Sequence, residues 1–580
     1  MPRAMFFAVS AFAALLTIFG CSKTEVITVY GPFVTEEGLL GPEPGELPDP
    51  DGGASVNLTV SGRAGYYRHV PLPSGLSGYR VYEVCQFVTV QAVGWAPPHA
   101  VLGEDTSDEL GRYSIDISTS ADFYIRVLAD MDYGTRITVS ASTLFPLIEP
   151  VAKTRTSLAP PEPILYAASS KILHRADGDQ QADVIADTKL PYARGGAFSI
   201  LGTFYKCLRT MEAAGVLNSL PDKLNVVWSP GNLGQYFSLS TSSEDFFAAV
   251  PGTAFIFMGE GEDHYLTVSG GDPYDVQNSD HDEYDEAVLA HEFGHFIMFT
   301  TSRDQNWGGP HSGESIVPAA AYSEGLPSAI GCALLGNSAY IDTRGLPPTS
   351  ELLFAFDCED PPMVPGVEGY DAEFSVIAVG WDILDGLNGL TDFDNDGVEI
   401  DFTSFFNSLS NLATRDEPYD IAWLASLLQQ LIDDGALTIA QANDLMASEG
   451  AAFPPMASDL WPEDLLLPDA VTGGLDASTG PGGTPPNAEL GANANAVFRF
   501  DLATSEDVTF ELEATPFVYF AANHRIDLYI YDLNHHLVFY MIGIEQEKSA
   551  TVALADGVYM VRVHHAAPNP QPVTFSLRTQ

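Results

Sequence analysis

The feature that most constrains this chain is the segment AVLAHEFGHFIMF, residues 287–299, which places two histidines and a glutamate inside an apolar stretch. Its length and apolar composition are typical of a buried helix. Burying such polar groups costs several kcal/mol unless they are paired or bound to something. Residues four apart lie on one face of a helix, so His291 and His295 can reach a single ion. The fold must therefore bring a partner to this helix.

Glu292 stands between these histidines, where its carboxylate can hydrogen-bond a water molecule on such an ion. H-E-x-x-H on a helix is the motif of zinc peptidases. A catalytic zinc needs a third protein ligand and one open position. The chain after His295 continues FIMFTTSRD, which excludes a nearby third histidine. The other solution is a glutamate on a second helix, and Glu324 lies in the apolar, small-residue stretch AAAYSEGLPSAIG.

H-E-F-G-H followed about thirty residues later by S-E-G resembles the gluzincin metallopeptidases, in which a second helix supplies a glutamate ligand. The stretch GGPHSGES, with the later AAAYSEG, is similar to a group of bacterial lipoproteins and secreted proteins with that catalytic domain. The resemblance implies that His291, His295 and Glu324 bind one zinc ion and that Glu292 is the general base. Thermolysin-like members carry Asp where this chain has Ser328. Pro327 fits a helix best in its first turn.

Zinc lowers the pKa of bound water towards about 7, so Glu292 can accept its proton as the water attacks a peptide carbonyl. A positioned donor should stabilise the resulting oxyanion, and His311, Tyr322 and Tyr370 are the candidates. We therefore expect a zinc-dependent endopeptidase that acts on protein or peptide substrates outside the cytoplasm. The alternative is a catalytically inactive, zinc-stabilised binding lipoprotein. The intact Glu292 favours the enzyme, because a structural zinc needs the ligands but not the base.

The regions on either side predict β-structure. Residues 55–155 contain short alternating runs such as FVTVQAVGW and GRYSIDIS, which predict a small β-sandwich. The stretch TSDELGRYSIDIS with ADFYIRVLA resembles the carboxypeptidase-regulatory-like (transthyretin-like) domain. Residues 496–580 repeat this pattern. There, RIDLYIYDLN and ALADGVYMVRVHH resemble the bacterial pre-peptidase C-terminal domain, another β-sandwich.

Residues 160–465 mix strand patterns such as LNVVW with helical ones such as EFSVIAVGWDILDGL. Strands first and helices after indicate an α+β domain. Residues 466–495 are rich in Gly, Pro and Asn and are expected to form a linker. The expected fold class is therefore multidomain, with an α+β zincin-like catalytic domain flanked by two β-sandwich domains.

The N-terminus, MPRAMFFAVSAFAALLTIFGCSK, has one Arg before an apolar run of about fifteen residues. This is the length of a signal peptide and is short of the ~20 residues that span a bilayer. The end of the run, Ile18 to Cys21, resembles a lipobox and implies lipidation of Cys21. An ordinary cleaved signal is the alternative. We expect a lipoprotein signal at 1–21, an acidic Pro/Gly linker at 22–54, and a location in the cell envelope, lipid-anchored on the outer membrane or periplasmic face, or extracellular.

Charge excludes one class of partner. The chain has 78 Asp and Glu against 25 Lys and Arg, a net charge of −53. Such a surface repels phosphate backbones, so nucleic acid is not an expected partner.

Two acidic segments are candidates for calcium. Asp392, Asp394 and Asp396 match the start of a calcium loop, but its twelfth position is Thr403 instead of Glu. An Asp-rich exposed turn is the competing interpretation. The acids of residues 278–290 either interact with the dipole of the following helix or bind calcium beside it. The cysteines Cys85, Cys207, Cys332 and Cys358 show no C-x-x-C spacing, and their pairing stays open.

Overall fold

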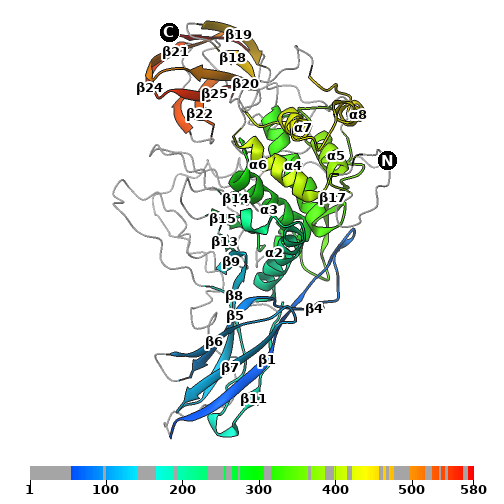
Figure 1. Cartoon of the computed structure of the whole chain (residues 1–580), viewed down its shortest axis with the longest axis vertical. Helices are drawn as coiled ribbons and strands as arrows, with labels where there is room; N and C mark the ends of the chain where they lie inside the picture. The colour runs from blue at the N-terminus through cyan, green and yellow to red at the C-terminus, as the bar shows by residue number, and fades with distance from the viewer. Residues whose placement is uncertain are drawn as a thin grey trace, which may run out of the picture.

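The structure is a computed structural model of the whole chain. It describes residues 54–580 except for the following segments: 96–98, 141–164, 189–193, 222, 229, 231–253, 257–263, 272–274, 306–314, 364–366, 386–397, 399, 415–420, 456–461, 466–468, 476–494, 516–525, 534–536, 543–546 and 566–572. Within the described part lie several β-sheets and seven α-helices. The chain is therefore multidomain, and it has β-sandwich-like regions towards both ends (Figure 1).

Two sheets build the N-terminal region. The long strand β1 (Val56–Arg68) is the centre of the first, and its neighbours are β4 (Val81–Val84), β7 (Arg112–Thr119), β11 (Gln180–Gln181) and β12 (Val184–Ala186). β7 alternates between exposed and buried residues, as the period of two predicts for a strand with one face in a core. A small hairpin, β2 (Pro71–Leu72) with β3 (Gly75–Leu76), follows β1.

The second sheet has eight strands and continues into the central region. Its order is β14-β15-β13-β9-β8-β5-β6, with β10 paired to β8. The strands are β5 (Val88–Gly94), β6 (Val101–Thr106), β8 (Phe123–Tyr133), β9 (Thr135–Ser140), β10 (Ala167–Ser169), β13 (Lys223–Val227), β14 (Ala254–Ile256) and β15 (His264–Thr267). Because β13 lies parallel to β9, the sheet crosses the boundary expected near residues 155–160. The sequence did not predict this pairing, because strand patterns on either side of the boundary do not show which strands pair with each other.

Six of the seven described helices follow this sheet in the chain, as the α+β pattern predicts, whereas the first one precedes β13. The described helices are α2 (Gly195–Ala213), α3 (Glu286–Thr301), α4 (Pro318–Leu335), α5 (Glu373–Leu384), α6 (Phe402–Leu412), α7 (Leu424–Asp433) and α8 (Ile439–Ser448). A two-stranded hairpin, β16 (Ala339–Arg344) with β17 (Glu351–Asp357), connects α4 to α5. One continuous core joins these helices to both N-terminal sheets.

The ends of α3 and α4 have identifiable contacts and sequence signals. α3 begins at Glu286, whose carboxylate is close to Arg68 of β1, 2.9 Å away, and to Lys206 of α2, 2.5 Å away. α4 begins with Pro318, where proline is favoured, and is followed by Gly336 in the left-handed conformation (φ 71°). Pro327 lies in the middle of α4, nine residues after its first residue, and not in its first turn.

α3 and α4 cross at unusually close range. A Cβ atom on Gly294 would lie 2.7 Å from the Cα atom of Pro327, and one on Gly331 would lie 2.7 Å from the carbonyl carbon of Ala290. Only glycine leaves room for such backbone contact. The two helices are therefore held at a separation that a larger residue at either glycine would change.

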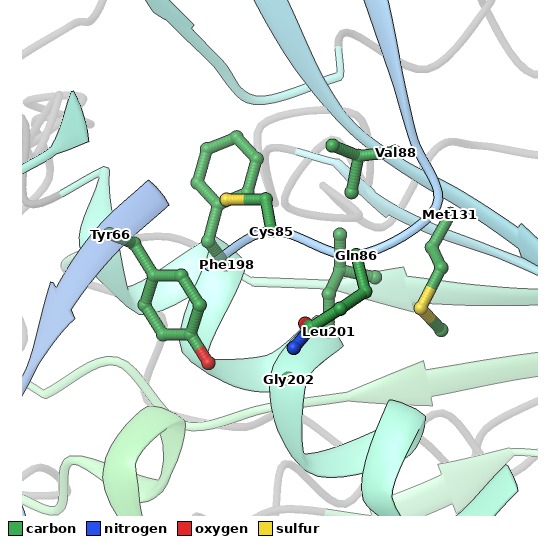
Figure 2. Close-up of a pocket in the computed structure, with 8 residues that line it drawn as sticks. All are labelled: Tyr66, Cys85, Gln86, Val88, Met131, Phe198, Leu201 and Gly202. Atoms are coloured by element: carbon green, nitrogen blue, oxygen red, sulfur yellow. The ribbon is translucent and has the colours of Figure 1, made fainter. Parts of the chain in front are cut away.

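A similar close contact joins α2 to the N-terminal sheets. Figure 2 shows a small pocket there, lined by Tyr66, Cys85, Gln86, Val88, Met131, Phe198, Leu201 and Gly202. A Cβ atom on Gly202 would lie 1.9 Å from the hydroxyl oxygen of Tyr66, which donates a hydrogen bond to Glu83. α2 is thus seated directly on β1. The cysteines Cys85, Cys207, Cys332 and Cys358 are buried and have free thiols.

The C-terminal region is a sandwich of two sheets with a second core between them, and Val497, Tyr531 and Met560 also pack against the core of the central region. One sheet contains β18 (Glu463–Leu465), β20 (Asn495–Leu502), β25 (Gly557–His565), β22 (Ile526–Asp532) and β23 (Leu537–Met541). The other contains β19 (Asp469–Leu475), β26 (Val573–Thr579), β21 (Glu506–Thr515) and β24 (Glu547–Leu554). The segment 469–475, expected in the linker, is thus a strand paired with the end of the chain. No helix in the described part is long and apolar enough to cross a membrane.

Candidate metal centre

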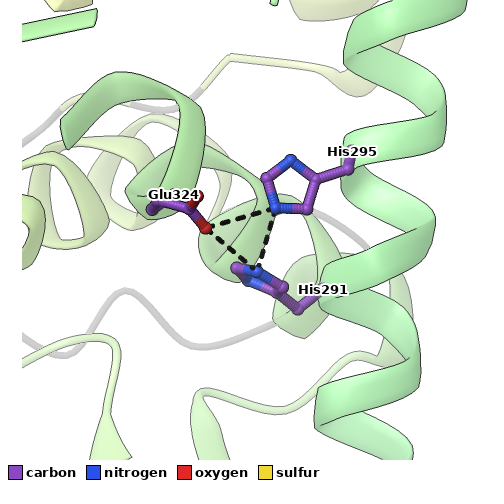
Figure 3. A group of neighbouring side chains, drawn as sticks. All are labelled: His291, His295 and Glu324. Carbon is purple, nitrogen blue, oxygen red and sulfur yellow. Dashed lines mark hydrogen bonds and ion pairs between the residues drawn. The ribbon is translucent and has the colours of Figure 1, made fainter. Parts of the chain in front are cut away.

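Three of the predicted ligands converge between α3 and α4. His291 and His295 are one turn apart on α3, and Glu324 faces them from α4 (Figure 3). The two Nε2 atoms are 3.1 Å apart, and the Glu324 Oε2 atom lies 3.7 Å from that of His291 and 3.3 Å from that of His295. Tetrahedral zinc with ligand bonds of about 2.0–2.1 Å requires ligand atoms about 3.4 Å apart. The three distances fit that requirement.

The outer nitrogens of both imidazoles are held by neighbours. Nδ1 of His291 is 2.8 Å from the Ser328 hydroxyl, and Nδ1 of His295 is 3.3 Å from a carboxylate oxygen of Asp304. A proton on each Nδ1, donated to these oxygens, leaves a lone pair on each Nε2. Two lone pairs and a carboxylate oxygen then point at one another, an arrangement that only a cation or a proton stabilises.

The electrostatics of His295 agree with this picture. Burial lowers the pKa of its imidazole most strongly, but Glu324 and Asp304 outweigh burial and raise that pKa well above its ordinary value. In the absence of a metal, these carboxylates favour the protonated form of His295. Because a metal ligand must be deprotonated, protons and metal compete for this site.

Glu292 is 6 % exposed and follows His291 on α3. Its carboxylate acts electrostatically on Tyr340 of β16. Burial, Asp342 and then Glu292 raise the pKa of the Tyr340 hydroxyl well above its usual range. The Tyr340 ring also lies edge-on to the His291 ring, with centroids 6.3 Å apart. Sequence reasoning missed Tyr340 and Asp304, because no sequence pattern marks them and only the tertiary fold places them beside the candidate ligands.

Of the predicted oxyanion donors, Tyr370 makes its contacts elsewhere and Tyr322 is near Asp304. The Tyr370 hydroxyl donates to the carbonyl of Ala452 at 2.9 Å, and its ring packs 5.0 Å from Trp423. Tyr322 is fully buried on α4, and burial and Asp304 raise the pKa of its hydroxyl. Asp304 is also the partner of His295, so the Tyr322 hydroxyl is near the candidate metal centre although its position on α4 differs from that of Glu324.

Several other predicted site residues lie outside the described residues. They are His311, the candidate calcium ligands Asp392, Asp394 and Asp396, and the candidate lipidation site Cys21.

A second acidic group stands beside α3. Carboxylate oxygens of Asp280, Asp282, Asp285 and Asp342 all lie within 4.8 Å of one another. Thr343 donates its backbone N–H to Asp285 at 2.7 Å. Burial, with repulsion among these carboxylates, raises the pKa of Asp282, Asp285 and Asp342 above the ordinary value. The sequence pointed to residues 278–290 but not to Asp342, which arrives from β16.

Comparison with known proteins does not assign this chain to a family. No family model matches the chain, and no curated protein matches it. Among solved structures, the pre-peptidase C-terminal domain of a collagenase from Bacillus anthracis aligns with 20 % of this chain and 93 % of that chain, at 12 % identity and a TM-score of 0.15. A periplasmic inhibitor of g-type lysozyme from Aeromonas hydrophila aligns with 19 % of this chain and 85 % of that chain, at 10 % identity and a TM-score of 0.12. TM-scores this low carry no conclusion about function.

Proposed function

We propose that this protein is a zinc-dependent endopeptidase of the gluzincin type. In this proposal His291, His295 and Glu324 hold the zinc ion and Glu292 is the general base. The observation that carries it is the convergence of three ligand atoms, at the spacing of a tetrahedral zinc site, beside the glutamate of an H-E-x-x-H helix. The mixed sheet and helices around this site would then form a zincin-like catalytic domain.

The roles of the residues follow from their positions. Zinc bound here would supply a polarised, activated water and a Lewis acid for the peptide carbonyl. Glu292 holds the proton that the attacking water loses and passes it to the leaving amine. Ser328 and Asp304 fix the tautomer and the orientation of the two imidazoles through their Nδ1 atoms. The short distance between α3 and α4 keeps Glu324 opposite both histidines.

The experiment compares the full-length wild type with Glu292→Gln. Zinc content is measured by mass spectrometry, and cleavage is measured on a mixed peptide library. Glutamine keeps the size of the side chain and does not alter the ligands, so both proteins should bind one zinc ion. Cleavage should occur only in the wild type, because the base is lost in the variant.

Other outcomes decide between the proposals. Zinc in both proteins and cleavage in neither would favour the inactive, zinc-stabilised binding lipoprotein. No zinc in either protein would refute the metal site itself. As a further control, Glu324→Ala should reduce the zinc content, since it removes one of three ligands while leaving Glu292 in place.

We also propose that the protein is exported and anchored in the cell envelope by a lipid on Cys21, and that its substrates are proteins or peptides found there. The support is the N-terminal apolar run that ends at Cys21. Labelling of the wild type with a fatty-acid analogue, and loss of the label in Cys21→Ser, would establish the anchor. Equal labelling of both proteins would place the lipid at another residue, and labelling of neither would leave an ordinary signal peptide.

A further inference from the structure

We infer that the β16–β17 hairpin binds a large apolar side chain of the peptide substrate, within a few residues of the bond that is cleaved. The inference rests on the proposed function and adds a substrate class to it. It concerns four aromatic residues, which we call the aromatic strip: Tyr340, Phe354, Phe356 and Phe374.

The rings of the aromatic strip form one continuous surface. Tyr340 stacks on Phe356, with centroids 4.7 Å apart and an angle of 8° between the rings. Phe354 lies 5.4 Å from Phe356 and stacks on Phe374 at 6.4 Å. The strand register explains this: Tyr340 is directly opposite Phe356, and Phe354 is two residues before Phe356 on the same face.

One end of the aromatic strip is in solvent, and the other is at the candidate metal centre. Phe354 is 41 % exposed, whereas Phe374 is buried. Tyr340 lies 6.4 Å from Phe354 on one side and 6.3 Å from the imidazole of His291 on the other. A side chain that packs on Phe354 is thus two ring contacts from a zinc ligand. At about 3.3 Å per residue of extended chain, this corresponds to about four residues of peptide or fewer.

The exposed part of β17 is more apolar than a solvent-facing strand requires. Leu352 and Leu353 are 37 % and 47 % exposed and directly precede Phe354. Contiguous exposed apolar side chains mark binding surfaces more often than scattered ones do. Aromatic surfaces suit apolar side chains, and the contact with His291 makes a peptide held for cleavage the occupant that fits this place.

The test uses the full-length, zinc-loaded protein and its Phe354→Ser variant. Peptides with Phe or Leu near the cleaved bond are compared with peptides that carry Ser there. Phe354→Ser should lower kcat/KM for the apolar peptides about tenfold, mainly through KM, and should leave the Ser peptides unchanged. Tyr82→Ser is the matched control: Tyr82 is an aromatic strand residue of similar exposure, 42 %, in the N-terminal region. It should leave both peptide classes unchanged.

Binding separates failure of this inference from failure of the peptidase. Fluorescently labelled peptides are titrated against Glu292→Gln with and without Phe354→Ser. If the wild type cleaves peptides and Phe354→Ser has the same kcat/KM as the wild type for both apolar and Ser peptides, the aromatic strip is not the substrate surface and the peptidase proposal stands. If nothing is cleaved but apolar peptides bind through Phe354, the surface stands and the peptidase falls. If nothing is cleaved or bound, both fall. If the wild type is a dimer and Phe354→Ser is a monomer, the aromatic strip is a self-association surface instead.

Discussion

Replacing Gly294 by alanine should weaken zinc binding by forcing α3 and α4 apart. The new Cβ atom would lie 2.7 Å from the Cα atom and 2.8 Å from the carbonyl oxygen of Pro327. Both are backbone atoms, so no change of rotamer relieves the clash. Non-bonded carbon atoms prefer about 3.5–4.0 Å, so the helices must separate by about 1 Å. Metal–ligand distances tolerate only about 0.2 Å, and Glu324 is on the other helix from both histidines.

The effect on folding should be smaller than the effect on zinc. Overpacking of a core costs about 1–3 kcal/mol, and the better helix propensity of alanine returns about 1 kcal/mol. The free energy of unfolding of the metal-free protein should therefore fall by about 2 kcal/mol at most. Zinc affinity, by contrast, should fall about 10–100-fold, the range found when the support of a metal ligand is lost.

The assay is competition for zinc with a chromophoric chelator, together with thermal unfolding in EDTA. Gly202→Ala is the matched control. It is the same substitution in a buried helix, α2, which carries none of the candidate ligands, and the new Cβ atom would lie 1.9 Å from the Tyr66 hydroxyl oxygen. It should cost stability without changing zinc affinity. Unchanged zinc affinity in Gly294→Ala would show that the helix crossing does not set the ligand spacing.

Three further changes have definite expected outcomes. Ser328→Ala removes the 2.8 Å partner of His291 Nδ1 and should lower zinc affinity about tenfold by chelator competition; equal affinity would show that this hydroxyl does not orient the ligand. Burial raises the pKa of Asp342, so the folded state binds more protons and the free energy of unfolding should fall as pH rises above about 4. Asp342→Asn should flatten this dependence in urea titrations with EDTA, and an unchanged slope would contradict the assignment. Gly202→Ala should cost about 1–3 kcal/mol in the same titrations because its Cβ atom would overlap the Tyr66 hydroxyl; no loss would mean that α2 can shift freely.

The sequence alone could predict that the candidate ligands lie together, because the arrangement of the two histidines is local. His291 and His295 are four residues apart, and a helix necessarily places them on one face. The apolar surroundings of Glu324 showed that it needs a partner as well. Both inferences depend on helix periodicity and on the cost of burying polar groups, and these are readable in a single stretch of chain.

The surroundings of the ligands were not predictable in the same way. Asp304 and Tyr340 reach the site only after the chain has turned back, and no periodic pattern marks either residue. The roles of Tyr322 and Tyr370 as oxyanion donors stay predictions, because the direction of a hydroxyl depends on packing that the sequence does not show. The close helix crossing was also hidden: Gly294 reads as a weak position in a helix unless the position of Pro327 is known.

The pairing of β13 with β9 has a consequence for how the protein is made. The strands of residues 88–140 leave the ribosome before residues 223–227. The edge of the sheet at β9 is therefore available for pairing when β13 is synthesised. Parallel strands pair slowly because a long crossover must close first, here through α2. We therefore expect the N-terminal sandwich to act as a template for the central region. A chain that started at residue 160 would have to form the parallel β13–β15 pair with one edge bare, and an edge of that kind invites aggregation.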